Sequence, residues 1–144
     1  MNKKLINKED ILKIYTDGAA RGNPGPAACC FLFVHDGQII HKGCDFIGTA
    51  TNNTAEYRAI INALKVAEKF HTEHLQVFSD SYLAIQQINR KWKINSPHLS
   101  DLLNKIFKLS KKYKNIEFIH VKRNNPYIKK CDTLCNERLD AEGF

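Results

Sequence analysis

The sequence has no long run of apolar residues and no apolar segment close behind its N-terminus. The longest apolar run covers residues 27–34, far fewer than the roughly 20 residues that a helix needs to cross a bilayer. Charged residues at 8–10 interrupt the apolar stretch that a secretory signal requires. No repeat or low-complexity linker divides the 144 residues. We therefore expect one cytoplasmic domain over residues 1–144, with a polar lead-in at 1–10 and no membrane partner.

The cysteines form no Cys-x-x-Cys pair. Two of them lie four residues apart, and no His stands at zinc-finger spacing near them, which disfavours a structural zinc site. Their number, five, is odd. We expect buried free thiols, as in a reducing cytoplasm. The residues concerned are Cys29, Cys30, Cys44, Cys131 and Cys135.

Acidic residues are in the minority. The chain has 22 Lys and Arg against 15 Asp and Glu, a formal net charge of +7. Such an excess favours a polyanionic partner, above all nucleic acid. The alternative is a set of ordinary solubilising lysines, and net charge alone does not decide between the two.

Apolar spacing and turn residues predict an α/β domain. Asp36-Gly37 between apolar runs indicates a tight hairpin, and Ser96-Pro97 indicates an N-cap and first helical position. We expect an antiparallel meander followed by parallel strands joined by crossovers, hence a mixed five-stranded sheet flanked by helices. The predicted strands are 11–20, 27–35, 38–47, 75–78 and 116–121; the predicted helices are 54–70, 81–90, 96–113 and 132–140, with polar loops at 48–53 and 122–130.

One carboxylate, Asp17, follows the first apolar run and precedes three small residues at 18–20. Little side-chain bulk stands beside it, so a large ligand could approach the backbone closely. The alternative is that Asp17-Gly18 forms a hairpin turn. A better turn, residues 22–25, lies just downstream and weakens that interpretation.

Three more acidic residues stand at the ends of predicted elements. Each has an ordinary structural alternative: Glu56 completes a capping box with Asn53, Asp80 is an N-cap, and Asp132 complements the dipole of the last helix. Ligands of α/β sheets gather where strands end and helices begin. Four carboxylates directed at one point would stay ionised only with cations, and Mg²⁺ prefers such oxygen ligands.

As an ordered set, these segments resemble the type 1 ribonuclease H family, in a short form without the family's basic protrusion. The resemblance covers about residues 12–140, and each acidic residue has matching neighbours. The segments are Thr16-Asp17-Gly18, Gly22-Asn23-Pro24-Gly25, Thr51-Asn52-Asn53 with Ala55-Glu56, Ser79-Asp80-Ser81, and Cys131-Asp132-x-Leu134-Cys135-Asn136.

The resemblance implies a ribonuclease H-like fold and an endonuclease that cuts the RNA strand of RNA–DNA hybrids, leaving 5′-phosphate and 3′-hydroxyl ends. It implies two Mg²⁺ ions, with Mn²⁺ as a substitute. We also expect a monomer without an obligate protein partner. The implied catalytic and metal ligands are Asp17, Glu56, Asp80 and Asp132, with Glu56 also near a ribose 2′-hydroxyl. The implied nucleic-acid contacts are Asn23, Thr51, Asn52, Asn53, Ser81, Lys91, Trp92, Lys93 and Arg123.

The sequence departs from the family's pattern in the loop at 122–130, which lacks the His that many members carry. Arg123 and Asn124 are the two candidates to replace it. Tyr82 stands where the family often has Gln. For Trp92, the alternative to a nucleic-acid contact is that its ring packs in the core.

Two other functions remain as alternatives. A non-catalytic nucleic-acid-binding module of the same fold would favour lysines over four acidic residues at these positions. Another nuclease or integrase of the fold would not require Asn52, Asn53 and the 22–25 segment.

Overall fold

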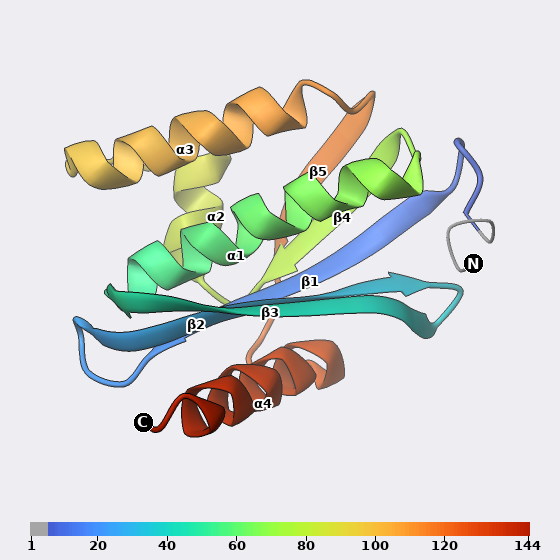
Figure 1. Cartoon of the computed structure of the whole chain (residues 1–144). Helices are drawn as coiled ribbons and strands as arrows, with labels where there is room; N and C mark the ends of the chain where they lie inside the picture. The colour runs from blue at the N-terminus through green and yellow to red at the C-terminus, as the bar shows by residue number, and fades with distance from the viewer. Residues whose placement is uncertain (1–5) are drawn as a thin grey trace.

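The computed structural model describes residues 6–144 and contains one mixed sheet of five strands in the order β3-β2-β1-β4-β5 (Figure 1). β1, β2 and β3 pair antiparallel, whereas β4 pairs parallel with both β1 and β5. The predicted fold class is confirmed. The elements are β1 Ile11–Ala20, β2 Gly25–His35, β3 Gln38–Ala50, α1 Asn52–Ala67, the short 3₁₀ helix η2 Glu68–Phe70, β4 His74–Ser79, α2 Tyr82–Ile88, α3 Pro97–Ser110, β5 Asn115–His120 and α4 Pro126–Ala141.

Helices cover both faces of the sheet: α1, α2 and α3 lie on one side and α4 on the other (Figure 1). Successive side chains of a strand point to opposite faces, so β1 supplies Leu12 and Ile14 to the α1 side and Tyr15 to the α4 side. The middle of β1, residues 14–17, is therefore buried, whereas residues 18–20 at its C-terminal end are half-buried. Of the predicted polar lead-in, residues 1–5 lie outside the described residues, and Ile6 is buried in the larger core.

The hairpin predicted at Asp36-Gly37 is confirmed. It joins β2 and β3 with both residues at positive φ, 50° and 73°, as a tight two-residue turn requires. The loop predicted at 48–53 is wrong. β3 continues to Ala50, which pairs with Gly25, and α1 begins at Asn52, so a single residue separates the two elements.

The start predicted for the last helix is also wrong, by six residues. α4 begins at Pro126, and the side chain of Asn125 caps it by accepting hydrogen bonds from the backbone N–H groups of Tyr127 and Ile128. An N-cap followed by proline is the same signal that correctly predicted the start of α3 at Ser96-Pro97. The basic residues after it, Lys129 and Lys130, are exposed on the helix and not in a loop.

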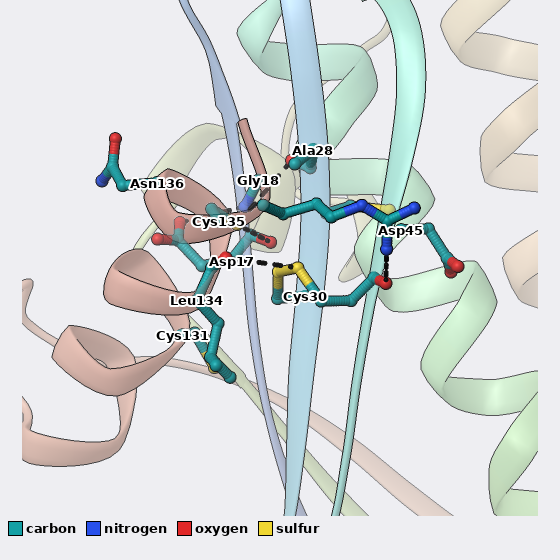
Figure 2. Close-up of a disulfide and its surroundings, with 12 residues drawn as sticks. Asp17, Gly18, Ala28, Cys30, Asp45, Cys131, Leu134, Cys135 and Asn136 are labelled. Carbon is teal, nitrogen blue, oxygen red and sulfur yellow. Dashed lines mark hydrogen bonds between the residues drawn. A yellow bond between two sulfur atoms is a disulfide. The ribbon is translucent and has the colours of Figure 1, made fainter. Parts of the chain in front are cut away.

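The prediction that all five cysteines are free thiols is wrong for two of them. Cys30 on β2 and Cys44 on β3 are register partners and are joined by a disulfide (Figure 2). Cys29, Cys131 and Cys135 are free and buried, as predicted. The pairing follows from the β2–β3 register, which spacing along the sequence does not reveal. Within residues 6–144, no helix combines the length and apolar character needed to cross a membrane.

Candidate active site

Asp17 lies within β1 and not in a turn, so the hairpin interpretation of Asp17-Gly18 is wrong. Gly18 pairs with Cys29 of β2, and a Cβ on Gly18 would lie 2.3 Å from the backbone carbonyl carbon of Ala55. The small residue therefore makes room for the first turn of α1, and both Gly18 and Ala19 also line the acidic pocket described below. This close approach brings Glu56 beside Asp17.

Glu56 does not form a capping box with Asn53. The N-cap of α1 is Thr51, whose hydroxyl accepts from the backbone N–H of Thr54. The Glu56 carboxylate accepts instead from the backbone N–H of Gly18 at 2.9 Å, and the same N–H lies 3.0 Å from Oδ1 of Asp17. One backbone donor thus orients two carboxylates.

Asp80 does not cap α2 either, because Ser81 is the N-cap and accepts from the backbone N–H of Ala84. The side chain of Asp80 is only 8% exposed, and its Oδ2 lies 3.4 Å from Nε of Arg123. Its Oδ1 is buried with no hydrogen-bond partner in the described part of the chain. A buried carboxylate oxygen without a partner is costly, which is the arrangement expected of a cation ligand.

Carboxylate oxygens of Asp17, Glu56 and Asp80 lie within 4.8 Å of one another. Asp132 lines the same pocket, of about 290 Å³, from the second turn of α4. Its predicted role at a helix start is wrong, since α4 begins six residues earlier. The fold thus brings all four predicted acidic residues to one pocket, from β1, α1, the end of β4 and α4.

The electrostatics of this pocket favour cations. Burial, then the charges of Asp80 and Asp132, raise the pKa of Asp17 to about 8, against the opposing effects of the Gly18 N–H and Arg123. Burial and the neighbouring Asp17 and Asp80 raise the pKa of Glu56 well above its ordinary value. Proximity of like charges favours the protonated forms. A divalent cation would remove that repulsion, and an all-oxygen donor set is the one that Mg²⁺ prefers.

Of the three asparagines predicted as substrate contacts, Asn52 lines the pocket and Asn23 and Asn53 do not. Oδ1 of Asn52 accepts from the backbone N–H of Ala20, and Oδ1 of Asn23 accepts from the backbone N–H of Asn52. Asn23 therefore ties the β1–β2 turn to the start of α1. Thr51 and Asn53 are exposed beside them.

The basic segment Lys91-Trp92-Lys93 lies between α2 and α3 and does not line the acidic pocket. All three residues are exposed, and Trp92 is 47% exposed, so the core-anchor alternative is wrong. The Trp92 ring packs edge-on against Tyr82, with centroids 5.3 Å apart. Tyr82 thus supports the Trp from the position where the family often has Gln.

Sequence reasoning missed Arg21. Its guanidinium donates to the side-chain oxygen of Asn136 at 3.2 Å and pairs with Asp140 at 2.8 Å. It thereby ties the β1–β2 turn to α4, which carries Asp132. No local signal could have revealed it, because its partners lie more than a hundred residues away.

A mixed sheet of this strand order, with carboxylates gathered at the end of its central strand, defines a class: ribonuclease H-like domains with an acidic centre suited to divalent metal. The comparisons make the assignment more specific. Residues 15–137 match the family model described as "Reverse transcriptase-like". This match and a ribonuclease H that is 32% identical over 95% of its own length show that the chain belongs to the ribonuclease H family.

Two curated relatives and one solved structure illustrate the likeness. Ribonuclease HI of Halobacterium salinarum is 40% identical over 127 residues, which cover 88% of this chain but 63% of the relative, so the chain spans less than two thirds of that protein. Ribonuclease H of Caldanaerobacter subterraneus subsp. tengcongensis is 32% identical, covering 94% of this chain and 95% of the relative. The crystal structure of LC11-RNase H1 in complex with RNA/DNA hybrid superposes with a TM-score of 0.85 at 34% identity, covering 91% of this chain and 98% of that one.

Proposed function

We propose that this chain is an endonuclease that hydrolyses the RNA strand of RNA–DNA hybrids and leaves 5′-phosphate and 3′-hydroxyl ends. The observation that carries the proposal is the group formed by Asp17, Glu56 and Asp80, whose oxygens lie within 4.8 Å of one another in a pocket open to solvent. Membership of the ribonuclease H family and the hybrid bound to LC11-RNase H1 support this substrate over duplex DNA.

The four acidic residues would hold two divalent ions, Mg²⁺ or in its place Mn²⁺. When bound, the ions would supply an activated water and stabilisation of the leaving oxygen. The chain's own part is to fix the ligands. The Gly18 N–H orients Asp17 and Glu56, while Ser81 caps α2 and leaves Asp80 free to face the pocket. Asp132 closes the opposite side from α4.

The hybrid would lie across Asn52, which lines the pocket, and the neighbouring Asn23 and Asn53. Asn23, Asn52 and Asn53 would face its minor groove, with Glu56 near a ribose 2′-hydroxyl that distinguishes RNA from DNA. Thr51 and Ser81 would lie close to phosphates, although both hydroxyls already accept helix-capping hydrogen bonds. Lys91, Trp92 and Lys93 would contact the DNA strand.

Arg123 is the better candidate to replace the loop His that the sequence lacks. It lines the acidic pocket and pairs with Asp80, whereas Asn124 does neither. Its side chain is 92% exposed, so it can turn from Asp80 toward a substrate or product phosphate. A guanidinium suits that task because it binds phosphate oxygens in pairs.

The test is cleavage of duplexes labelled on one strand: RNA–DNA, RNA–RNA and DNA–DNA, each with Mg²⁺ or with chelator. We expect the RNA strand of the hybrid to be cleaved when Mg²⁺ is present and to stay intact in chelator. Comparable cleavage of duplex DNA would overturn the proposal. We also propose that the chain acts as a single cytoplasmic domain over residues 1–144 and as a monomer without an obligate partner. Size-exclusion chromatography with light scattering measures the oligomeric state.

A further inference from the structure

A second group of metal-ligating side chains lies behind the acidic pocket and has no part in the proposed reaction. The sulfur atoms of Cys30, Cys44 and Cys135 lie within 4.8 Å of one another. They come from β2, β3 and α4, at the place where the helix crosses the two strands (Figure 2). Cys30 and Cys135 are buried, and Cys44 is half-buried. We name these three residues the thiol cluster.

Only the Cys135 sulfur of the thiol cluster is a free thiol, because Cys30 and Cys44 are joined by the disulfide. The Cys135 thiol donates only to backbone carbonyl oxygens, of Asp17 at 3.6 Å and Ala28 at 3.8 Å. Such S–H···O contacts are weak. The sulfur of Cys44 lies 3.5 Å from the carbonyl oxygen of Leu134.

Once the disulfide is reduced, the three cysteine sulfurs gathered here match the donor preference of a thiophilic cation. Zn²⁺ binds thiolate sulfur at about 2.3 Å, so three sulfurs around one tetrahedral ion lie about 3.8 Å apart. The Cys135 sulfur already lies within 4.8 Å of the other two, whereas the sulfurs of Cys30 and Cys44 must move apart to that spacing once their bond is reduced. Sulfur ligands select Zn²⁺ and other soft ions over Mg²⁺, so Mg²⁺ would not occupy the thiol cluster.

We propose that the reduced chain binds one thiophilic cation, such as Zn²⁺ or Cd²⁺, through Cys30, Cys44 and Cys135. Binding replaces three thiol protons with the metal, so the protons go to solvent. The half-buried Cys44 marks the side from which the ion enters. The Cys30–Cys44 disulfide uses two of the same sulfurs, and therefore a thiol reductant must first supply two electrons and two protons. Disulfide and cation exclude each other.

The sequence pattern argued against a structural zinc site because no pair of cysteines has finger spacing. The thiol cluster instead draws its ligands from positions 14 and 91 residues apart along the chain. Cys29 provides a matched control. It is buried and free, but it lies on the other face of β2, where Nδ2 of Asn62 contacts its sulfur at 3.3 Å.

The test titrates Cd²⁺ into the full chain after reduction with a phosphine and without oxygen, and follows the ultraviolet charge-transfer absorption of cadmium–thiolate bonds. We expect this absorption to reach its maximum at one Cd²⁺ per chain. Cys44→Ser and Cys135→Ser should each weaken binding at least tenfold, whereas Cys29→Ser should match the parent.

Circular dichroism checks that each variant is folded, and the measurement on the parent does not depend on any variant. The absence of the absorption in the reduced parent would overturn the proposal. So would an unchanged absorption in folded Cys44→Ser, or its loss only in Cys131→Ser, because then other thiols bind the ion.

Discussion

The acidic pocket and the basic segment at 91–93 are both assigned to the same substrate, yet the fold holds them in different ways. The pocket draws its carboxylates from β1, α1, the end of β4 and α4, and three of them are wholly or partly buried. The basic segment is a single exposed connection between α2 and α3. Charges held by several packed elements keep fixed positions, so each should be indispensable. Exposed charges on one connection are screened by salt, so their contributions should be small and additive.

The largest expected effect is that of Asp80→Asn. Asn keeps the shape but loses the charge that holds cations, so cleavage should fall by at least about a hundredfold, or about 2.7 kcal/mol of transition-state stabilisation. The fold should survive, because Ser81 and not Asp80 caps α2. Single-turnover cleavage and thermal melting measure both effects.

Asp101→Asn is the matched control for that variant, because Asp101 is exposed on α3 and outside the pocket. It should cleave like the parent. If Asp80→Asn cleaves as fast as Asp101→Asn, Asp80 is not a ligand of the catalytic metal.

The second effect concerns how the free energy of unfolding depends on pH when no metal is present. The folded protein binds more protons than the unfolded chain, because the pKa of Asp17 is raised to about 8 and that of Glu56 is also raised. The free energy of unfolding should therefore fall as pH rises from about 4, the unfolded value, toward about 8. Asp17→Asn should flatten this dependence in urea unfolding at several pH values.

Magnesium should reverse the loss. At a concentration a hundredfold above its dissociation constant, a ligand of the folded state adds about 2.7 kcal/mol. We expect this gain at pH 8 and a smaller one at pH 6, where protons compete for the same carboxylates. An equal gain in Asp17→Asn, Asp80→Asn and the parent would indicate that Mg²⁺ binds elsewhere.

Gly18→Ala tests whether packing places the carboxylates. The added Cβ would lie 2.3 Å from the backbone of Ala55, and overpacking of this kind costs about 1–3 kcal/mol. Chemical denaturation should show that loss, and cleavage should fall as well, because α1 must move away with Glu56. Parental stability would mean that β1 and α1 do not approach as closely as described.

The smallest effect is expected from Lys91→Ala with Lys93→Ala. The logarithm of hybrid affinity should fall with the logarithm of salt concentration, with a slope of about −0.9 per neutralised phosphate if the rule for duplex DNA applies. The double variant should flatten that slope. Replacing Lys105 and Lys108, both exposed on α3, should leave the slope unchanged. Equal effects of the two pairs would mean that the basic segment binds the hybrid no differently from other surface lysines.

The sequence predicted the sheet and the Asp36-Gly37 turn because local patterns specify them. It predicted the four acidic residues from their places at element ends and from the family resemblance. Its errors have different physical causes. The alternatives for Glu56 and Asp80 failed because the adjacent Thr51 and Ser81 cap the helices instead, and local sequence offers two candidates for each cap. The start of α4 was missed although Asn125-Pro126 carries the signal. The Cys30–Cys44 pairing and the Arg21 contacts depend on residues distant in sequence, so no local pattern could reveal them.

The central claim is that these carboxylates bind the cations needed for RNA cleavage. Its most direct test is the Mg²⁺ dependence of hybrid cleavage at pH 6 and pH 8. Protons and cations compete for Asp17, whose pKa is raised to about 8. The Mg²⁺ concentration for half-maximal cleavage should therefore be lower at pH 8 than at pH 6. A Mg²⁺ requirement that does not change with pH, or cleavage that persists in chelator, would contradict the account.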